Sequence, residues 1–138
     1  MPRNVKLKAV MDGRMVRAMD DGEDFGFIPV MIRVNTAAGA TNSVELTMER
    51  AFTVIDFMAH NIGGNGTSGD KCQLFNGSNA ISDQMDLNIN DNVYARAVSI
   101  DDAQMEVAAG GTLKVTATDG GGSDLKAMIC YVTGYYHK

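Results

Sequence analysis

Apolar residues recur at every second position in three segments of the chain, residues 27–35, 43–49 and 112–118. A period of two is typical of a β-strand that buries one face and exposes the other. Residues 51–60 are instead apolar on both faces, which predicts a strand running through the middle of a sheet. Pro29 lacks a backbone donor, so the first strand is expected to start there or to lie at a sheet edge.

Four further segments, residues 71–75, 81–89, 93–100 and 125–136, also have strand-like patterns. Turns rich in Gly and Asn separate them, and the Asn-Gly pair at 76–77 is a hairpin signal. The total of about eight short strands predicts an all-β fold, either a β-sandwich or a barrel. A jelly roll is one eight-stranded solution, and the spacing leaves the strand order open.

Residues 101–109 break the alternation and predict a short helix, with Asp101 or Asp102 as its N-cap and Gly110 at the C-terminal cap. A Gly pair follows the helix, which raises the question of a phosphate-binding loop. Such a loop leads from a strand into a helix and needs a Lys and a Ser or Thr at fixed spacing. Here the order is reversed, so we expect a corner without chemistry.

The length of 138 residues corresponds to one domain, which buries roughly two thirds of its unfolded surface. Residues 1–24 stand apart from it. Their short alternating stretch of apolar and basic residues is followed by the charged, glycine-containing run MDDGEDFG. We therefore expect an extended N-terminal arm over residues 1–24 and a single β-sandwich domain over residues 25–138.

The charge is distributed unevenly along the chain. The net charge is −5, yet residues 1–19 carry +4 and the remaining residues −9. An acidic body repels nucleic acid, so no nucleic-acid partner is expected. A basic arm on such a body either reaches a neighbouring acidic protein or folds back on its own domain. The arm residues that we assign to contact with such a protein or with another subunit are Val5, Lys6, Leu7, Lys8, Arg14 and Arg17.

Composition adds little that points to a compartment. No run of 18 apolar residues is present, so no membrane span is expected. The first ten residues lack the long apolar region of a signal peptide, which indicates synthesis in the cytoplasm. Cys72 and Cys130 lie in apolar, strand-like runs outside any CxxC motif, so two reduced, buried thiols are favoured over a disulfide.

Catalytic and metal-binding patterns are missing from the sequence. His60 and His137 are isolated, and no zinc-ligand spacing occurs. The oxygen-rich stretches 20–24 and 88–92 do not follow the EF-hand pattern, which favours solvated turns. Asp56, in an apolar run, is interpreted as a structural carboxylate or one at a subunit contact. We therefore expect no enzyme activity, no metal and no cofactor.

Three tyrosines, Tyr131, Tyr135 and Tyr136, cluster near the C-terminus. Tyrosines of this kind stack on a sugar ring, pack a last strand into its sheet, or fill a subunit interface, where tyrosine is enriched. Packing into the sheet or an interface is the favoured interpretation. They are our candidate aromatics for an interface between subunits.

Residues 76–120 resemble a pattern found in small virion proteins of tailed bacteriophages. In that pattern an Asn-Gly hairpin precedes a strand of the form AI-D---DL. A strand with Arg-Ala follows, then IDDA and AAGGTL before a threonine-rich strand. The matching pieces here are Asn76 and Gly77, Ala80 and Ile81, Asp83, Asp86 and Leu87, Arg96 and Ala97, residues 100–103, and residues 108–113.

The resemblance implies a capsid decoration, or cement, protein. Such proteins are typically β-rich, often trimeric, and sit on the outer surface of the expanded head. The implied partners are the phage major capsid protein and further copies of the chain, and the implied location is the virion after synthesis in the host cytoplasm. The motif consists of turns and core positions, and the arm 1–24 lies outside it.

Two other functions remain open at this point. One is a phage head-fibre, tail or receptor-binding β-sandwich subunit that contacts a cell-surface glycan, for which an exposed aromatic platform is needed. The other is an enzyme on a small jelly roll, which requires clustered His and carboxylate ligands. The absence of Trp weakens the first, and the isolated histidines weaken the second.

Overall fold

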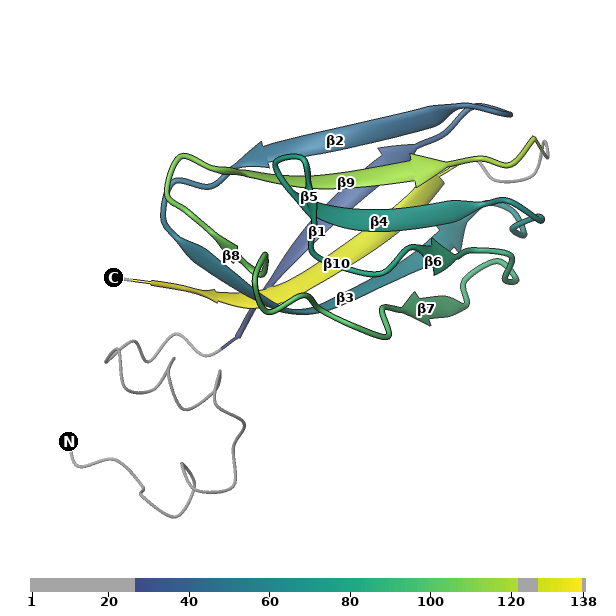
Figure 1. Cartoon of the computed structure of the whole chain (residues 1–138). Helices are drawn as coiled ribbons and strands as arrows, with labels where there is room; N and C mark the ends of the chain where they lie inside the picture. Colours follow the sequence, from purple (N-terminus) through teal and green to yellow (C-terminus); the bar gives the residue numbers. More distant parts are fainter. Residues whose placement is uncertain (1–26, 122–126, 138) are drawn as a thin grey trace, which may run out of the picture.

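The computed structural model describes residues 27–121 and 127–137, which form two antiparallel sheets and contain no helix (Figure 1). The predicted all-β sandwich is therefore confirmed. The predicted arm, residues 1–24, lies outside the described residues, and so do its six assigned contact residues.

Sheet A carries the two longest strands at its centre and orders its members β1-β10-β3-β7, with β8 also paired to β3. Its strands are β1 Ile28–Asn35, β3 Phe52–Ile62, β7 Tyr94–Arg96, β8 Glu106–Val107 and β10 Ala127–Tyr136.

Sheet B orders its strands β2-β9-β4-β5, with β6 also paired to β4. Its strands are β2 Thr41–Thr47, β4 Lys71–Asn76, β5 Asn79–Ala80, β6 Met85–Asp86 and β9 Thr112–Thr118.

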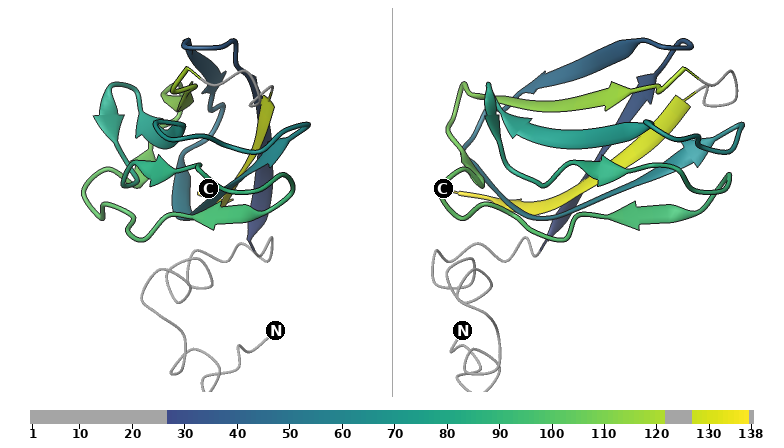
Figure 2. Two further views of the ribbon diagram at one scale, coloured as in Figure 1. Left: turned by 90° about the vertical axis from the view of Figure 1, so that its right-hand side faces the viewer. Right: turned by 45° about the vertical axis from the view of Figure 1, so that its right-hand side comes forward.

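The connectivity is that of a jelly roll. If β5 with β6, and β7 with β8, are each counted as one interrupted strand, eight strands remain, as the sequence predicts. Successive strands then cross between the sheets except from β4 to β5, which share sheet B. Double-sheet jelly rolls have eight strands arranged in this way. The two layers face one another when the molecule is viewed along its long axis (Figure 2).

The core lies between the two sheets and is built by the apolar positions of the alternating segments. Ile32 and Val34 of β1 face Leu113 and Val115 of β9 across it, and all four are almost fully buried. Phe57 lies in the central strand β3 and is also fully buried. The period of two therefore identified the buried faces correctly in these strands.

The segment 81–89, predicted as one strand, is interrupted. The backbone N–H of both Ile81 and Ser82 donates to the carbonyl of Leu74. The Ser82 hydroxyl accepts from the Leu74 N–H and donates to the Asp83 carbonyl. Side-chain hydrogen bonds thus replace the regular ladder there. Within residues 79–89 only the two short strands β5 and β6 pair with β4, one toward each end of that strand.

The segment 93–100 is also shorter as a strand than predicted, because β7 ends at Arg96. After Ala97 donates to the Phe57 carbonyl, the chain leaves β3. The Asp83 carboxylate accepts from the Ser99 N–H at 3.0 Å, and Ile100 forms an isolated bridge with Ser82. These contacts draw the segment toward sheet B.

The predicted helix at 101–109 is wrong. The Asp101 carbonyl accepts from the N–H groups of Gln104 and Met105, which makes one turn, and the Asp101 side chain caps it. The Met105 carbonyl then accepts from Val54, and β8 pairs with β3. Pairing with a long neighbouring strand satisfies more backbone groups than a helix this short can.

The predicted corner at the glycine pair is present. Gly110 has φ of +79°, a conformation that favours glycine, and it donates to the Met48 carbonyl. A Cβ on Gly111 would approach the Ala108 carbonyl oxygen to 2.9 Å. The pair turns the chain directly into β9.

Candidate functional site

The outer face of sheet A carries a row of apolar side chains that crosses the sheet. Met31 of β1 is opposite Tyr131 of β10, Tyr131 is opposite Met58 of β3, and Met58 is opposite Arg96 of β7. Their sequence neighbours Ile32, Cys130 and Ala59 are buried in the core. Because side chains alternate along a strand, the row points away from the core. This row, together with a second row described next, forms the surface that we call the outer face of sheet A.

The second row of this face runs through Arg33, Ile129, His60 and Tyr94, which are successive partners across the sheet. The His60 ring stacks on Tyr94, with centroids 4.6 Å apart and an interplanar angle of 13°. On its other side His60 lies 5.7 Å from the Tyr131 ring. Three aromatic rings are thus held together on a sheet face by strand register.

Several members of this face are open to solvent. Met31 is 65% exposed and Tyr94 is 54% exposed, although both side chains are large and mostly apolar. A shallow groove of about 430 Å³ lies between Met58, Tyr94 and Tyr131. Because exposed, contiguous apolar surface is common at interaction sites, this face is the candidate functional site.

Polar atoms within the aromatic group are only partly satisfied. His60 is 9% exposed; its Nε2 lies 3.4 Å from the Tyr131 hydroxyl, and its Nδ1 is buried without a hydrogen-bond partner. Partial desolvation, and then a hydrogen bond with Tyr94, raise the pKa of Tyr131 above its ordinary value. The tyrosine hydroxyl is therefore protonated at neutral pH and available as a donor.

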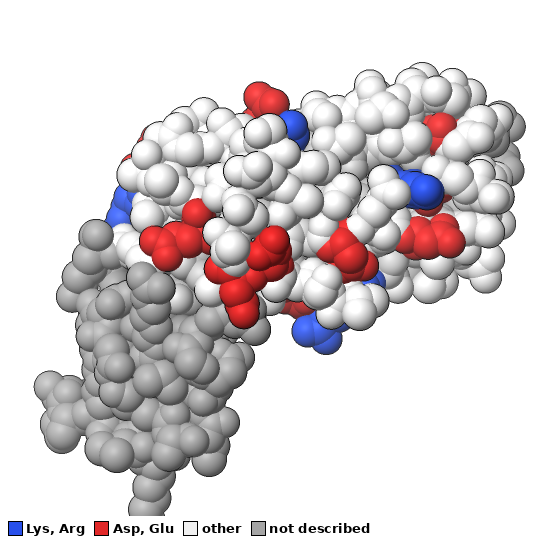
Figure 3. Space-filling model, in the orientation of Figure 1, with Lys and Arg blue, Asp and Glu red and all other residues white. Residues whose placement is uncertain are grey.

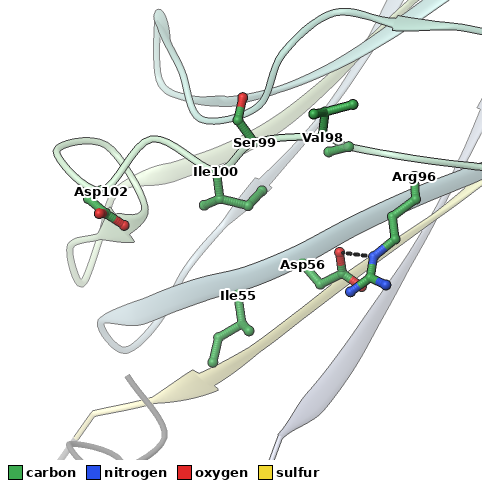
Figure 4. A pocket seen from close by; sticks show the side chains of 8 residues that line it. Ile55, Asp56, Arg96, Val98, Ser99, Ile100 and Asp102 are labelled. Atoms are coloured by element: carbon green, nitrogen blue, oxygen red, sulfur yellow. Dashed lines mark hydrogen bonds and ion pairs between the residues drawn. The ribbon is translucent and has the colours of Figure 1, made fainter. Parts of the chain in front are cut away.

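An ion pair borders the apolar row. Arg96 Nε donates to Asp56 Oδ1 at 2.9 Å across β7 and β3, as Figure 4 shows. The Arg96 side chain is 69% exposed, so water screens the pair and it contributes little to stability. Asp56 thus lies on the outer face of sheet A, where it is the partner of Arg96.

The segment that follows β7 forms the edge of a second hollow of about 500 Å³ beside this ion pair. In Figure 4 Ile100 lies on the side of the segment that faces β3. Val98, two residues earlier, is 92% exposed. Asp101 and Asp102, which follow Ile100 in the chain, are also exposed. The segment at the edge of sheet A thus exposes a valine at one end and two carboxylates at the other.

The described residues carry five basic and eleven acidic side chains, a net charge of −6. Acidic atoms form a band across the middle of the face seen in Figure 3, whereas basic atoms are few and scattered. Two of the five basic residues, Arg33 and Arg96, lie on the outer face of sheet A. This face is therefore less acidic than the rest of the described surface.

The structure separates the three tyrosines that the sequence grouped. Tyr131 lies on the outer face of sheet A. Tyr135 is only 3% exposed and stacks on His137 with centroids 5.4 Å apart. Tyr136 meets Phe52 edge-on at 5.0 Å. Two of the three therefore pack within the domain, in agreement with the favoured interpretation, and Tyr131 alone belongs to the exposed aromatic group.

A register shift between Thr133 and Gly134 accompanies this separation. At Gly134 the two backbones approach so closely that a Cβ would lie 2.1 Å from the Thr53 carbonyl oxygen. Glycine in a strand often marks such a close approach.

Sequence reasoning missed Met31, Met58 and Tyr94. A signal for Met31 was present, since it lies on the face of an alternating strand that should be polar, whereas Met58 lies in a segment that is apolar on both faces. Tyr94 belongs to β7, which the sequence placed in a longer strand. What was missing is the register that brings the three together.

The two cysteines are both buried and free, with their sulfur atoms 3.7 Å apart. Cys72 belongs to β4 and Cys130 to β10, so the pair spans the core between the sheets. A hydrogen bond with Cys130, and then burial, raise the pKa of Cys72 well above its ordinary value. The predicted reduced, buried thiols are confirmed.

The oxygen-rich stretch 88–92 serves local turns. Asp91 Oδ1 accepts from the Gly63 N–H, and Asp86 accepts from the Asn88 N–H. The stretch 20–24 lies outside the described residues. Within residues 27–121 and 127–137, no group of three or more His, Cys, Asp and Glu side chains is placed to hold a metal ion. The described part of the chain also has no helix that is long and apolar enough to cross a membrane.

Comparison of the chain with protein-family models, with curated proteins and with solved structures gives no match.

Proposed function

We propose that the protein is a non-enzymatic capsid decoration, or cement, protein of a tailed bacteriophage. As a homotrimer it binds the outer surface of the expanded head, bridges neighbouring subunits of the major capsid protein and stabilises the shell. The observation that carries the proposal is the outer face of sheet A, where Met31 and Tyr94 are exposed beside Tyr131. A domain built for contact rather than catalysis has this kind of surface.

The resemblance of residues 76–120 to small phage virion proteins supports the same function. In the fold this segment contributes turns and core positions. Gly77 turns the β4–β5 hairpin with φ of +60°, and Ile81 and Leu87 are buried. The resemblance thus concerns the scaffold, while the exposed face lies largely on β1, β3 and β10, outside the resembling segment.

Shell stabilisation follows from mass action. A protein that binds only the expanded arrangement of capsid subunits lowers the free energy of that arrangement in proportion to its occupancy. A symmetric trimer engages several subunits at once, which raises avidity without any new type of contact. The function therefore requires a rigid body and a recognition surface, and no reacting group.

Charge supports a contact through the arm as well. Residues 1–19 carry +4, and the described body carries −6. An extended arm of this charge would add main-chain hydrogen bonds at a neighbouring sheet edge and meet acidic partner surface with Lys6, Lys8, Arg14 and Arg17. Deletion of residues 1–24 is expected to weaken head binding, and unchanged affinity would rule out this role for the arm.

The decisive experiment is co-sedimentation of the full-length protein with undecorated, expanded heads of its phage. Saturable pelleting at about one trimer per three-fold site is expected. Unexpanded heads are the matched control and should bind at least tenfold more weakly. A folded protein that does not pellet with expanded heads would overturn the proposal.

One observation favours a second candidate, a fibre or receptor-binding subunit that contacts a glycan. Tyr94 and Tyr131 lie 6.0 Å apart beside the Asp56–Arg96 pair, so an aromatic platform with adjacent polar groups is present. Sugar rings bind to such platforms through their apolar faces. Binding on a glycan array that is lost in Tyr94→Ala, together with no head binding, would favour this candidate.

A further inference from the structure

We propose that the outer face of sheet A receives the edge segment 97–102 of a second copy of this chain. The contact is head to tail: the Val98 side chain of one copy inserts between Met58, Tyr94 and Tyr131 of the next. This inference rests on the proposed function, in which the protein is a trimer, and it names the two surfaces that meet in that trimer. The chain carries both surfaces, so a second copy is a sufficient partner.

The edge segment presents Val98 in a fixed position. The Ala97 N–H donates to the Phe57 carbonyl, and the Ser99 N–H donates to the Asp83 carboxylate. The Asp101 N–H then donates to the Ile81 carbonyl at 2.7 Å. Val98 lies between these anchors and is 92% exposed. A preorganised apolar side chain loses little conformational entropy on binding, which favours association.

The receiving groove is apolar at its walls and floor. It is lined by Met58, Tyr94 and Tyr131 and has a volume of about 430 Å³. Register fixes Tyr131 opposite Met58, and the stack on His60 holds Tyr94. Methionine adapts its shape to an inserted side chain, and tyrosine supplies large contact area at low entropic cost. Burial of a whole valine side chain in such a groove is favourable.

The charges around the two surfaces are complementary. Asp101 and Asp102 are exposed at the far end of the edge segment from Val98, whereas Arg33 and Arg96 are exposed on the receiving face, where Arg96 also pairs with Asp56. This complementarity is specific, because the described residues are acidic overall and few basic side chains are available. Opposite charges at the rim of an apolar contact orient the partners and speed association.

The placement of the two surfaces permits a closed ring. The outer face of sheet A and the edge at β7 lie on adjacent sides of the sandwich, not on opposite sides. A head-to-tail contact between adjacent sides turns each successive copy, and a ring of a few copies forms when that rotation closes. If the two surfaces lay on opposite sides of the sandwich, the same contact would build a filament. If each copy used the same face, association would stop at a dimer.

The test uses two variants of the full-length protein, Val98→Asp on the edge and Tyr94→Glu on the face. Sedimentation velocity at micromolar concentration is expected to show a trimer for the wild type and monomers for each variant, with association weakened about a hundredfold. Thr47→Glu, exposed on sheet B, is the control and should remain trimeric. Circular dichroism and thermal melting establish that all variants are folded.

Mixing the two variants distinguishes a head-to-tail contact from a symmetric one. The Val98→Asp chain retains an intact face and the Tyr94→Glu chain an intact edge, so one native contact can form between them. A 1:1 heterodimer is expected, without larger species. If the mixture remains monomeric, or if Val98→Asp alone stays trimeric, the proposed contact is wrong.

A wild-type protein that is monomeric at all concentrations also overturns this contact, and would point to residues 1–26 or a capsid subunit as the occupant of the face. The proposed function is tested separately, since wild-type monomers that pellet with expanded heads would leave capsid binding intact. A wild-type trimer that fails to pellet with expanded heads would instead keep this contact and overturn the proposed function.

Discussion

The two sheets of this jelly roll have similar inner faces and very different outer faces. On sheet B, hydroxyl groups pair across the strands: Thr41 with Thr118 at 3.0 Å and Ser43 with Thr116 at 2.8 Å. Glu45 is opposite Lys114, whose ammonium group lies over the Phe75 ring. These groups satisfy one another and remain compatible with water, as is usual for the solvent face of an antiparallel sheet.

On sheet A, the corresponding positions carry Met31, Met58, Tyr94 and Tyr131 instead. The core does not require them, since it is filled from the other side of the same strands. Solvent does not favour them either, because each exposes apolar surface. The fold alone therefore accounts for the outer face of sheet B but not for the apolar side chains on the outer face of sheet A, which the proposed contact explains.

The strongest disruption is expected at Gly134, where the strand that carries Tyr131 approaches β3 most closely. Gly134→Val would place a Cβ 2.1 Å from the Thr53 oxygen and against the Phe52 ring. We expect the free energy of unfolding to fall by about 3–5 kcal/mol, measured by urea denaturation. Gly39→Ala, at φ of +70° with open space around it, is the control and should lose about 1 kcal/mol. An equal loss in both variants would contradict the close approach.

Conversion of the outer face of sheet A to the character of sheet B is the direct test of the comparison. The triple variant Met31→Thr, Met58→Thr, Tyr94→Thr is expected to fold, because threonine is favoured in strands. Its self-association and head binding should fall about a hundredfold, measured by sedimentation. The matched variant Thr41→Ala, Ser43→Ala, Thr47→Ala on sheet B should bind normally. Equal losses for both would show that the outer faces do not differ in function.

The thiol pair between the sheets makes stability depend on pH. The pKa of Cys72 is raised in the folded state above its ordinary value of 9.0, so the thiol ionises more readily in the unfolded chain. Stability is therefore fully present below pH 9 and is lost as the pH rises further, by at most about 1.4 kcal/mol per pH unit. Urea midpoints between pH 8 and pH 10.5 measure this.

The control for the thiol effect is Cys72→Ala, in which the pH dependence above pH 9 should become shallower. Reaction of the wild type with a thiol reagent at pH 8 is also expected only after unfolding, because both sulfur atoms are buried. Rapid labelling of the native protein would contradict the packing between the sheets.

The smallest effects are expected where polar groups on either outer face are paired in water. Asp56→Asn removes the ion pair with Arg96 on sheet A, and Ser43→Ala removes a hydroxyl pair on sheet B. Each should change the free energy of unfolding by less than about 1 kcal/mol. A loss of head binding in Asp56→Asn but not in Ser43→Ala would sharpen the comparison further, since it would place Asp56 at the contact.

Much of the scaffold was predictable from local patterns. Alternation located the buried positions of β1 and β9, and the Asn-Gly pair at Asn76 located the β4–β5 hairpin. The glycine corner before β9 was also recognised. These features depend on residues close in sequence, for which backbone geometry and burial act together. The helix at 101–109 failed because a distant strand, β3, competed for its backbone groups.

The alternating pattern in the sequence was enough to locate β1, β2 and β9 and the side of each that is buried, because both depend on a period that a short segment carries. Only the tertiary structure decided that Met31, Met58 and Tyr131 lie in one row, because their strands are far apart in the sequence and meet through pairing of β1, β10 and β3. It also decided that Tyr131 is half-buried on the outer face whereas Tyr135 is buried, because the rings of Phe27 and His137 pack against Tyr135.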